Sequence, residues 1–355
     1  MQWSQSGVQP LLEKTTLIPL DEKTTFIPLD DELEIDQQRY LSAEAHQWLK
    51  QGVAQRRKGN ITAALAGFQQ ALQAFRTLSQ PALEAKVLMT MAHLYYSIAD
   101  YLWAVDHARQ GLAIARRISS KTLIHQALSC LGNSYRHLGD LDKAQTCMTQ
   151  SLNLAQEMAD VEAEMRALSN LALVYRVKGE AAEAVILYEK SLSLAEVRQD
   201  NTAIEQILRN LGNTYYTLNN PRKTIEYYDR LLQLSRDRME LQVINKILRN
   251  LNSACYALGD YTRAVVYLQE RLRLVRQLQD LRSEMQTLES LAITYDTLGE
   301  RTKALQAREE RLKVAILLKD MQLQRQALSE LKMACLAEGD FERIRRYLDY
   351  LTESI

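Results

Sequence analysis

The octapeptide Arg209-Asn210-Leu211-Gly212-Asn213-Thr214-Tyr215-Tyr216 returns in altered form every 40 residues. One period later stands Arg249-Asn250-Leu251-Asn252-Ser253-Ala254-Cys255-Tyr256, and one and two periods earlier stand Ser169-Asn170-Leu171-Ala172-Leu173-Val174-Tyr175-Arg176 and Ser129-Cys130-Leu131-Gly132-Asn133-Ser134-Tyr135-Arg136. A fixed period of this length is typical of a solenoid, in which each repeat packs on its neighbours. The sequence therefore predicts one continuous body over residues 41–355.

The apolar pattern within each period is helical. Three core positions, separated by three and four residues, fall on one face of a first helix. Two of these rows are Leu88, Leu128, Leu168, Leu208, Leu248, Leu288 and Leu328, and Tyr95, Tyr135, Tyr175, Tyr215, Cys255, Tyr295 and Cys335. A second helix carries a small residue at Ala64, Ala104, Ala144, Ala184, Thr224, Ala264 and Ala304. Eight units of two helices each, about sixteen helices in all, are expected.

A turn follows the first helix of each unit. It reads Gly59-Asn60, Ala99-Asp100, Gly139-Asp140, Gly179-Glu180, Asn219-Asn220, Gly259-Asp260, Gly299-Glu300 and Gly339-Asp340. The first residue of each pair suits a left-handed helix end, and the second is expected to cap the next helix. Pro221 then occupies the first helical position, where proline is tolerated.

These residues resemble the tetratricopeptide repeat over residues 41–355. The Leu-Gly/Ala-x-x-Tyr of the first helix, the Gly-Asp turn and the alanine of the second helix carry the resemblance. The 40-residue period is longer than the usual unit and is similar to that of Pins-type polarity adaptors and of many bacterial repeat proteins. The resemblance implies an all-α, right-handed superhelix (α-solenoid) of about eight helix-turn-helix repeats, with a concave groove that binds extended peptides.

Polar residues that flank the core positions of the first helices are expected to line that groove. Asparagine both donates to and accepts from a peptide backbone, and arginine matches a carboxylate. The predicted groove residues are Asn133, Arg136, Arg166, Asn170, Arg176, Arg209, Asn210, Asn213, Tyr216, Lys246, Arg249 and Asn250. Such a wall suits an extended, acidic peptide. The alternative interpretation is a solvated polar face with asparagines that hold neighbouring helices together.

Residues 1–40 lie outside the repeat and are expected to form an extended tail. Residues 13–21 and 22–30 are a nine-residue tandem, each half with one proline, and residues 1–38 carry a net charge of −6. Because the whole chain is neutral, the remainder carries +6. This tail is a candidate tethered ligand for the groove, through Leu17, Ile18, Asp21, Phe26, Ile27, Asp30 and Asp31. The alternatives are a disordered leader and a strip packed on the first repeat.

No catalytic or cofactor motif stands out. The five histidines lack metal-ligand spacing, the four cysteines are scattered without a CxxC pair, and there is no phosphate loop or nucleophile elbow. The sequence therefore predicts a protein that is not an enzyme and has no cofactor and no metal. Zero net charge and the mixed groove disfavour nucleic acid, and no apolar run is long enough to span a membrane.

Two functions remain in view. The first is a cytoplasmic, non-catalytic protein-protein interaction scaffold, adaptor or assembly factor that binds an acidic peptide partner. The second is an accessory or regulatory (sensory) subunit of a bacterial enzyme or signalling system. The absence of a catalytic domain within these 355 residues favours the first. The partner's identity, the pathway and the oligomeric state do not follow from the sequence.

Overall fold

The computed structural model describes residues 29–340, 342, 343 and 345. The chain divides into two compact bodies, residues 1–80 and 81–355. The described part of the first body holds α1 (Leu29–Arg57) and α2 (Ile61–Thr77). Inside it, Phe68 and Phe75 are fully buried, and the His46 ring packs edge-on against Phe75.

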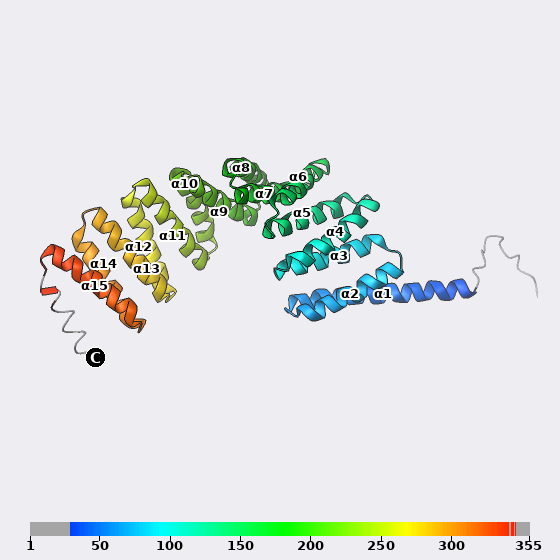
Figure 1. Cartoon of the computed structure of the whole chain (residues 1–355), viewed down its shortest axis with the longest axis horizontal. Coiled ribbons are helices and arrows are strands. Elements are labelled where there is room, and N and C mark those ends of the chain that lie inside the picture. The colour runs from blue at the N-terminus through cyan, green and yellow to red at the C-terminus, as the bar shows by residue number, and fades with distance from the viewer. Residues whose placement is uncertain (1–28, 341, 344, 346–355) are drawn as a thin grey trace, which may run out of the picture. The chain divides into compact units, whose positions relative to one another are not determined.

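The second body is a row of helix pairs in strict register (Figure 1). Its first helices are α3 (Pro81–Ser97), α5 (Lys121–His137), α7 (Val161–Lys178), α9 (Asn201–Thr217), α11 (Leu241–Leu258), α13 (Leu281–Thr297) and α15 (Met321–Glu338). Its second helices are α4 (Tyr101–Arg117), α6 (Leu141–Glu157), α8 (Ala181–Val197), α10 (Pro221–Asp237), α12 (Tyr261–Gln277) and α14 (Arg301–Leu317). Every first helix begins 40 residues after the previous one, and the described residues contain no strand. The predicted all-α solenoid is confirmed, and a sixteenth helix would fall on residues 341–355, most of which lie outside the described residues.

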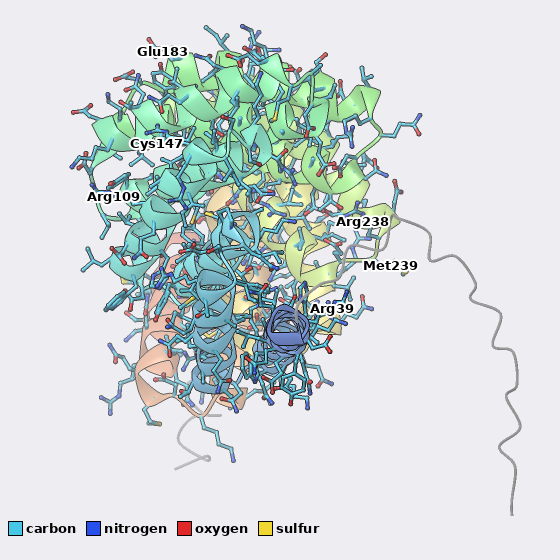
Figure 2. The ribbon with its side chains drawn as sticks, turned by 90° about the vertical axis from the view of Figure 1, so that its right-hand side faces the viewer. Arg39, Arg109, Cys147, Glu183, Arg238 and Met239 are labelled. Carbon is cyan, nitrogen blue, oxygen red and sulfur yellow. The ribbon has the colours of Figure 1, made fainter. Side chains whose placement is uncertain are left out.

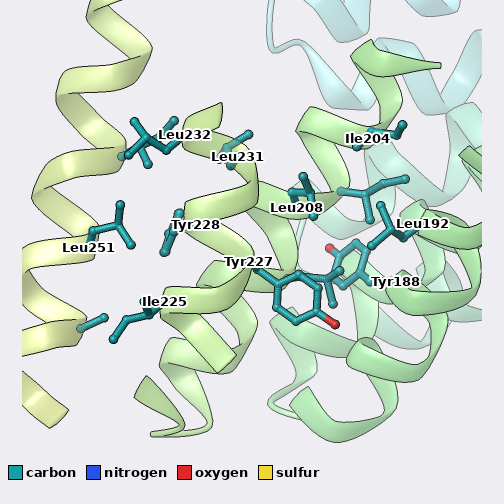
Figure 3. Packing of buried hydrophobic residues seen from close by; sticks show 14 of the residues in the cluster. Tyr188, Leu192, Ile204, Leu208, Ile225, Tyr227, Tyr228, Leu231, Leu232 and Leu251 are labelled. Atoms are coloured by element: carbon teal, nitrogen blue, oxygen red, sulfur yellow. The ribbon is translucent and has the colours of Figure 1, made fainter. Parts of the chain in front are cut away.

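The core lies between successive helices, where the predicted rows meet. Leu208, Leu211, Leu248 and Leu251 are fully buried, and each small residue of the second helix is at 0% exposure in the described repeats. Figure 3 shows the largest part of this core, where α8 to α11 bring leucines and the rings of Tyr188, Tyr227 and Tyr228 together. A few direct contacts between alternate helices join α3 to α5, α5 to α7 and α7 to α9, whereas no pair of second helices makes as many. The first helices of these repeats therefore lie closer together than the second helices, and they form the inner side of the row.

The turns follow the predicted chemistry with two exceptions. All eight turn residues have positive φ, including the two that are not glycine, Ala99 at 61° and Asn219 at 52°. The side chains of Asp100, Asp140 and Asp260 accept from the backbone N–H three residues on, as do those of Asn60 and Asn220. Glu180 and Glu300 make no such bond, so the expectation that every acidic turn residue caps the second helix is wrong for these two. Asp and Asn, with one methylene fewer than Glu, are the residues favoured at this position.

The turns between repeats also use the left-handed region, without any glycine. Ser79, Ser119, Ala159, Gln199, Met239, Gln279 and Lys319 have φ between 51° and 56°. Met239, the one large apolar residue among these seven, is 79% exposed (Figure 2). A left-handed residue with a side chain costs about 1 kcal/mol or more, so each of these positions is under local strain.

The predicted tail is wrong for its last third. Residues 29–40 are helical, because α1 begins at Leu29. Pro28 precedes the first residue of the helix and therefore breaks no bond within it, and the next proline is Pro81. Asp30 and Asp31 consequently lie in the first turn of α1 and not in an extended strand. The other proposed tail contacts, Leu17, Ile18, Asp21, Phe26 and Ile27, lie outside the described residues.

Candidate functional site

All twelve predicted groove residues come from four consecutive first helices, α5, α7, α9 and α11. None of them is fully buried, and Arg166, Arg209, Tyr216, Lys246 and Arg249 are exposed. We call the exposed side of these four helices the inner face. Between α7 and α9 it is hollowed by a cavity of about 150 Å³, lined among others by Arg166, Asn170 and Gln206.

The arginines of the inner face differ in their ion pairs. Arg209 pairs with Glu205 at 2.5 Å, and Arg166 pairs with Glu162 at 2.9 Å, in each case one turn earlier on the same helix. Arg136, Arg176 and Arg249 form no ion pair with any residue that the structure describes. Their charges are therefore available to a ligand, whereas those of Arg166 and Arg209 are already opposed by a carboxylate.

The charges of these arginines act on two buried tyrosine hydroxyls, those of Tyr188 and Tyr228. Burial raises the pKa of Tyr188, and the positive charges of Arg176 and Arg136 oppose that rise. Burial likewise raises the pKa of Tyr228, against the hydrogen bond from Asn250 and the charges of Arg209, Arg249 and Arg176. Arg176 thus acts on both hydroxyls, Arg136 of α5 on that of Tyr188, and Arg209 of α9 and Arg249 of α11 on that of Tyr228. We call Arg136, Arg176, Arg209 and Arg249 the arginine row.

The asparagines of the inner face are partly engaged in holding helices together. The Tyr228 hydroxyl donates to Asn213 Oδ1 at 2.6 Å and accepts from Asn250 Nδ2 at 2.9 Å. This bridge joins α9, α10 and α11, and it supports the interpretation of these two asparagines as structural. Each amide still keeps its other polar atom, so Asn213 retains a donor and Asn250 an acceptor for a ligand.

Beyond α11 the charges on the corresponding helix face change sign and are neutralised internally. Glu289 and Asp296 of α13 pair with Arg311 and Arg308 of α14, and Glu330 of α15 pairs with Arg311 as well. These residues surround a cavity of about 610 Å³ between α13, α14 and α15. The acidic residues that line this cavity are thus neutralised by arginines of the chain itself.

A second polar cluster lies at the ends of α3 and α5. His137 Nε2 is 2.8 Å from Arg136 Nη2 and 3.1 Å from the Tyr96 hydroxyl, and its ring stacks on Tyr101 at 4.4 Å. Burial and the charge of Arg136 lower the pKa of His137. The neutral imidazole therefore accepts the hydrogen bond of Arg136 and fixes its orientation at one end of the arginine row.

The sequence pattern missed the residues beneath the inner face. Tyr188, Tyr228 and Arg271 belong to second helices and were not among the candidates. The signal was present in the register, because Tyr188 and Tyr228 replace the Met148 and Leu268 of neighbouring repeats. A hydroxyl at an otherwise apolar position indicates a polar partner. The partners of Tyr228 are on the adjacent first helices α9 and α11, whereas the Tyr188 hydroxyl is buried without a hydrogen-bond partner among the described residues.

Three further observations concern metal-binding groups, membrane-spanning helices and cysteines. The described residues hold no group of three or more His, Cys, Asp or Glu side chains arranged to bind a metal ion. None of the helices that the structure describes is long and apolar enough to cross a membrane. Cys130, Cys255 and Cys335 are buried and form no disulfide, in keeping with a structural role, whereas Cys147 is only half-buried.

These features define a helical repeat protein with a basic inner face. A family model for the tetratricopeptide repeat matches residues 123–196 and 163–237. Residues 123–237 are therefore a tetratricopeptide repeat region, and the helix pairs outside it keep the same 40-residue register. No curated protein matches the sequence at a significant level.

Several solved structures share this fold. A signal transduction ATPase with numerous domains and a tetratricopeptide repeat sensor, from Pyrococcus horikoshii, is 15% identical with a TM-score of 0.59, over 91% of this chain and 48% of that one. This chain thus spans about half the length of that protein. The apo form of the quorum sensor NprR from B. thuringiensis is 16% identical with a TM-score of 0.52, over 91% of both chains. A Rap protein complexed with competence and sporulation factor is 18% identical with a TM-score of 0.52, over 84% of this chain and 83% of that one. Identities this low establish the fold alone.

Proposed function

We propose that this protein is a non-catalytic interaction scaffold that binds an extended, acidic peptide of a partner protein along the inner face. The observation that carries the proposal is the arginine row, in which Arg136, Arg176 and Arg249 lack an ion pair among the described residues. These unpaired guanidinium groups stand on three of the four first helices of the inner face, α5, α7 and α11. They suit a ligand that lies across the helices and carries several carboxylates.

The asparagines supply the second element of recognition. Asn170, Asn210 and Asn250 hold the same register position on α7, α9 and α11 and are all partly exposed. Their amides bind the ligand backbone independently of its sequence, and the arginines select for acidic side chains. Tyr216 and Tyr256, which are 57% and 41% exposed, add apolar contact area beside them.

A regulatory role is the second candidate. Among the similar structures are a quorum sensor, a tetratricopeptide repeat sensor and a Rap protein complexed with a sporulation factor. A ligand on the inner face contacts several repeats at once, and its binding stabilises one arrangement of those repeats over others. Under this reading the peptide is an effector that controls a partner bound elsewhere on the chain.

The tail remains a proposed ligand for the inner face only through residues 13–28. Its tandem places Asp21 and the apolar pairs Leu17-Ile18 and Phe26-Ile27 before the start of α1. A synthetic peptide of residues 13–28 tests this idea on a protein that lacks residues 1–28. Loss of acidic-peptide affinity in the intact chain, regained on truncation, is expected if the tail occupies the site.

The experiment for the main proposal is selection from a library of random synthetic octapeptides, followed by calorimetric titration of those recovered. We expect enrichment in Asp and Glu and an affinity that falls as salt is raised, because the contacts are charged and partly exposed. A matched titration uses Arg222→Glu, which reverses an exposed charge on the second helix α10. Recovery of no peptide, or of peptides without acidic residues, contradicts the proposal.

A further inference from the structure

Arg271 of α12 is a buried cation without a carboxylate partner. Its side chain is 4% exposed, and its Nε donates to Asn245 Oδ1 of α11 at 2.9 Å. Its two terminal nitrogens donate no hydrogen bond to a described residue, yet they are not among the side-chain atoms sealed off without a partner. They therefore keep a small contact with solvent.

The following repeat shows how the chain satisfies an arginine at this position. Arg311 stands 40 residues after Arg271 and is equally buried, at 4% exposure. Its Nη2 lies 3.3 Å from Glu289 of α13, and its Nη1 pairs with Glu330 of α15. Two carboxylates from the flanking first helices thus hold the guanidinium.

The same two positions carry no acid around Arg271. Moving back by 40 residues replaces Glu289 by Arg249 and Glu330 by Ser290. Arg271 consequently has a cation and a hydroxyl at the register positions where Arg311 has two carboxylates. The repeat that contains Arg271 thus has the guanidinium but lacks the two carboxylates that neutralise it in the next repeat.

A buried cation without a partner is costly, because removal of a charge from water is repaid only by a close opposite charge. Burial lowers the pKa of Arg271, and the charge of Arg249 lowers it further. Asp280 acts in the opposite direction, but its carboxylate caps α13 through the Ser283 N–H at 3.0 Å. No described carboxylate forms an ion pair with Arg271 or Arg249.

We propose that Arg271 and Arg249 form a carboxylate-binding subsite at the end of the inner face. Its ligand is an Asp or Glu side chain, or the C-terminal carboxylate, of a bound peptide. This inference rests on the proposed function and adds to it the position at which one acidic group of the peptide is bound. In this subsite the ligand's carboxylate takes the role that Glu289 and Glu330 perform for Arg311.

Glutarate, a free dicarboxylate, tests the subsite without a peptide. Its effect on the melting temperature is compared with that of sodium chloride at equal ionic strength, for wild type and two variants. Arg271→Leu places at this position the residue type that Leu231 provides, fully buried, one repeat earlier. Ser290→Glu supplies an internal carboxylate at the position that corresponds to Glu330. The control, Arg273→Leu, removes an exposed arginine of the same helix.

We expect glutarate to raise the melting temperature of the wild type and of Arg273→Leu, and not that of Arg271→Leu or Ser290→Glu. In chloride alone, Ser290→Glu should melt higher than wild type, because it gives Arg271 a counter-charge. An equal response to glutarate and chloride in the wild type overturns the subsite, as does an undiminished glutarate response in both variants. If Arg271→Leu fails to fold, the same glutarate response is measured on Arg249→Leu, which changes the exposed arginine of the subsite.

The recovered octapeptides then show whether the bound carboxylate comes from an acidic side chain or from the C-terminus. They also test the subsite separately from peptide binding as such. Replacing one acidic residue by its amide, or the free C-terminus by a carboxamide, should weaken binding to wild type by about ten- to a hundredfold at the position that enters the subsite. The same replacement should leave the affinity of Arg271→Leu within about twofold. Peptides that bind with equal sensitivity to both proteins overturn the subsite alone, whereas failure to recover any peptide overturns the proposed function.

Discussion

Arg209 of α9 donates to the carboxylate of Glu205, one turn earlier on the same helix, at 2.5 Å. One repeat later, the place of Glu205 is taken by Asn245, whose amide oxygen accepts from Arg271 instead. Arg249 is therefore left without the partner that Arg209 has. The two arginines look equivalent in the sequence, but the structure assigns the unopposed charge to Arg249.

This difference predicts unequal effects of the two arginines on peptide binding. Arg249→Glu should weaken an acidic octapeptide by at least about tenfold, since it removes a charge-assisted contact and adds repulsion. Arg209→Ala should cost less than about threefold, because its charge is already opposed by Glu205. Calorimetric titration measures both, with Arg222→Glu on α10 as the control for net charge. Equal losses in the two variants would contradict the assignment.

The bridge between α9, α10 and α11 predicts a stability difference between two tyrosines. Tyr228→Phe should lower the free energy of unfolding by about 1–2 kcal/mol, because it removes the hydroxyl that bonds to Asn213 and Asn250. Tyr216→Phe removes an exposed hydroxyl and should change stability by less than about 0.5 kcal/mol. Urea unfolding followed by circular dichroism compares them. A Tyr228→Phe protein as stable as wild type would show that the bridge carries no net energy.

The sequence predicts the register of this fold because each repeat encodes it several times. Leu208 and Leu248 define the same core position, and turn residues at fixed spacing define the helix ends. The ion-pair partner of an individual charged residue does not follow from the sequence pattern. Arg230 pairs with Glu196 of another helix, 34 residues earlier, and only the packing of that helix brings the two together. The helical state of residues 29–40 was missed because the proline spacing was extended past Pro28, the last proline of the tail.

The left-handed turns predict where glycine is stabilising. Ala99→Gly should raise the free energy of unfolding by about 1 kcal/mol, because Ala99 adopts a φ of 61° that strains a residue with a Cβ. Ala113→Gly, on the exposed side of α4, should lower it by about 1 kcal/mol, because glycine is unfavourable inside a helix. Chemical denaturation of the two variants tests the opposite signs. A loss of stability in both would contradict the role given to the turn.

Burial predicts the reactivity of the cysteines. It raises the pKa of Cys130 to about 11 and that of Cys255 to about 12, so little thiolate is present near neutral pH. At pH 8 iodoacetamide should modify half-buried Cys147 (Figure 2) slowly and leave the other three cysteines untouched in the native protein. Mass spectrometry of the alkylated peptides reads this out, with guanidinium-unfolded protein as the fully reactive control. Rapid modification of native Cys255 would contradict its placement in the core.

The central claim is that a peptide lies across the inner face, and photo-crosslinking locates it most directly. A photoreactive phenylalanine replaces Tyr216, 57% exposed on the first helix α9, or Ile186, 55% exposed on the second helix α8. Each protein is irradiated with a recovered acidic octapeptide, and mass spectrometry identifies the adduct. The account predicts crosslinking from position 216, lost on competition with unlabelled peptide, and none from position 186. Competable crosslinking from position 186 with none from position 216 would contradict it.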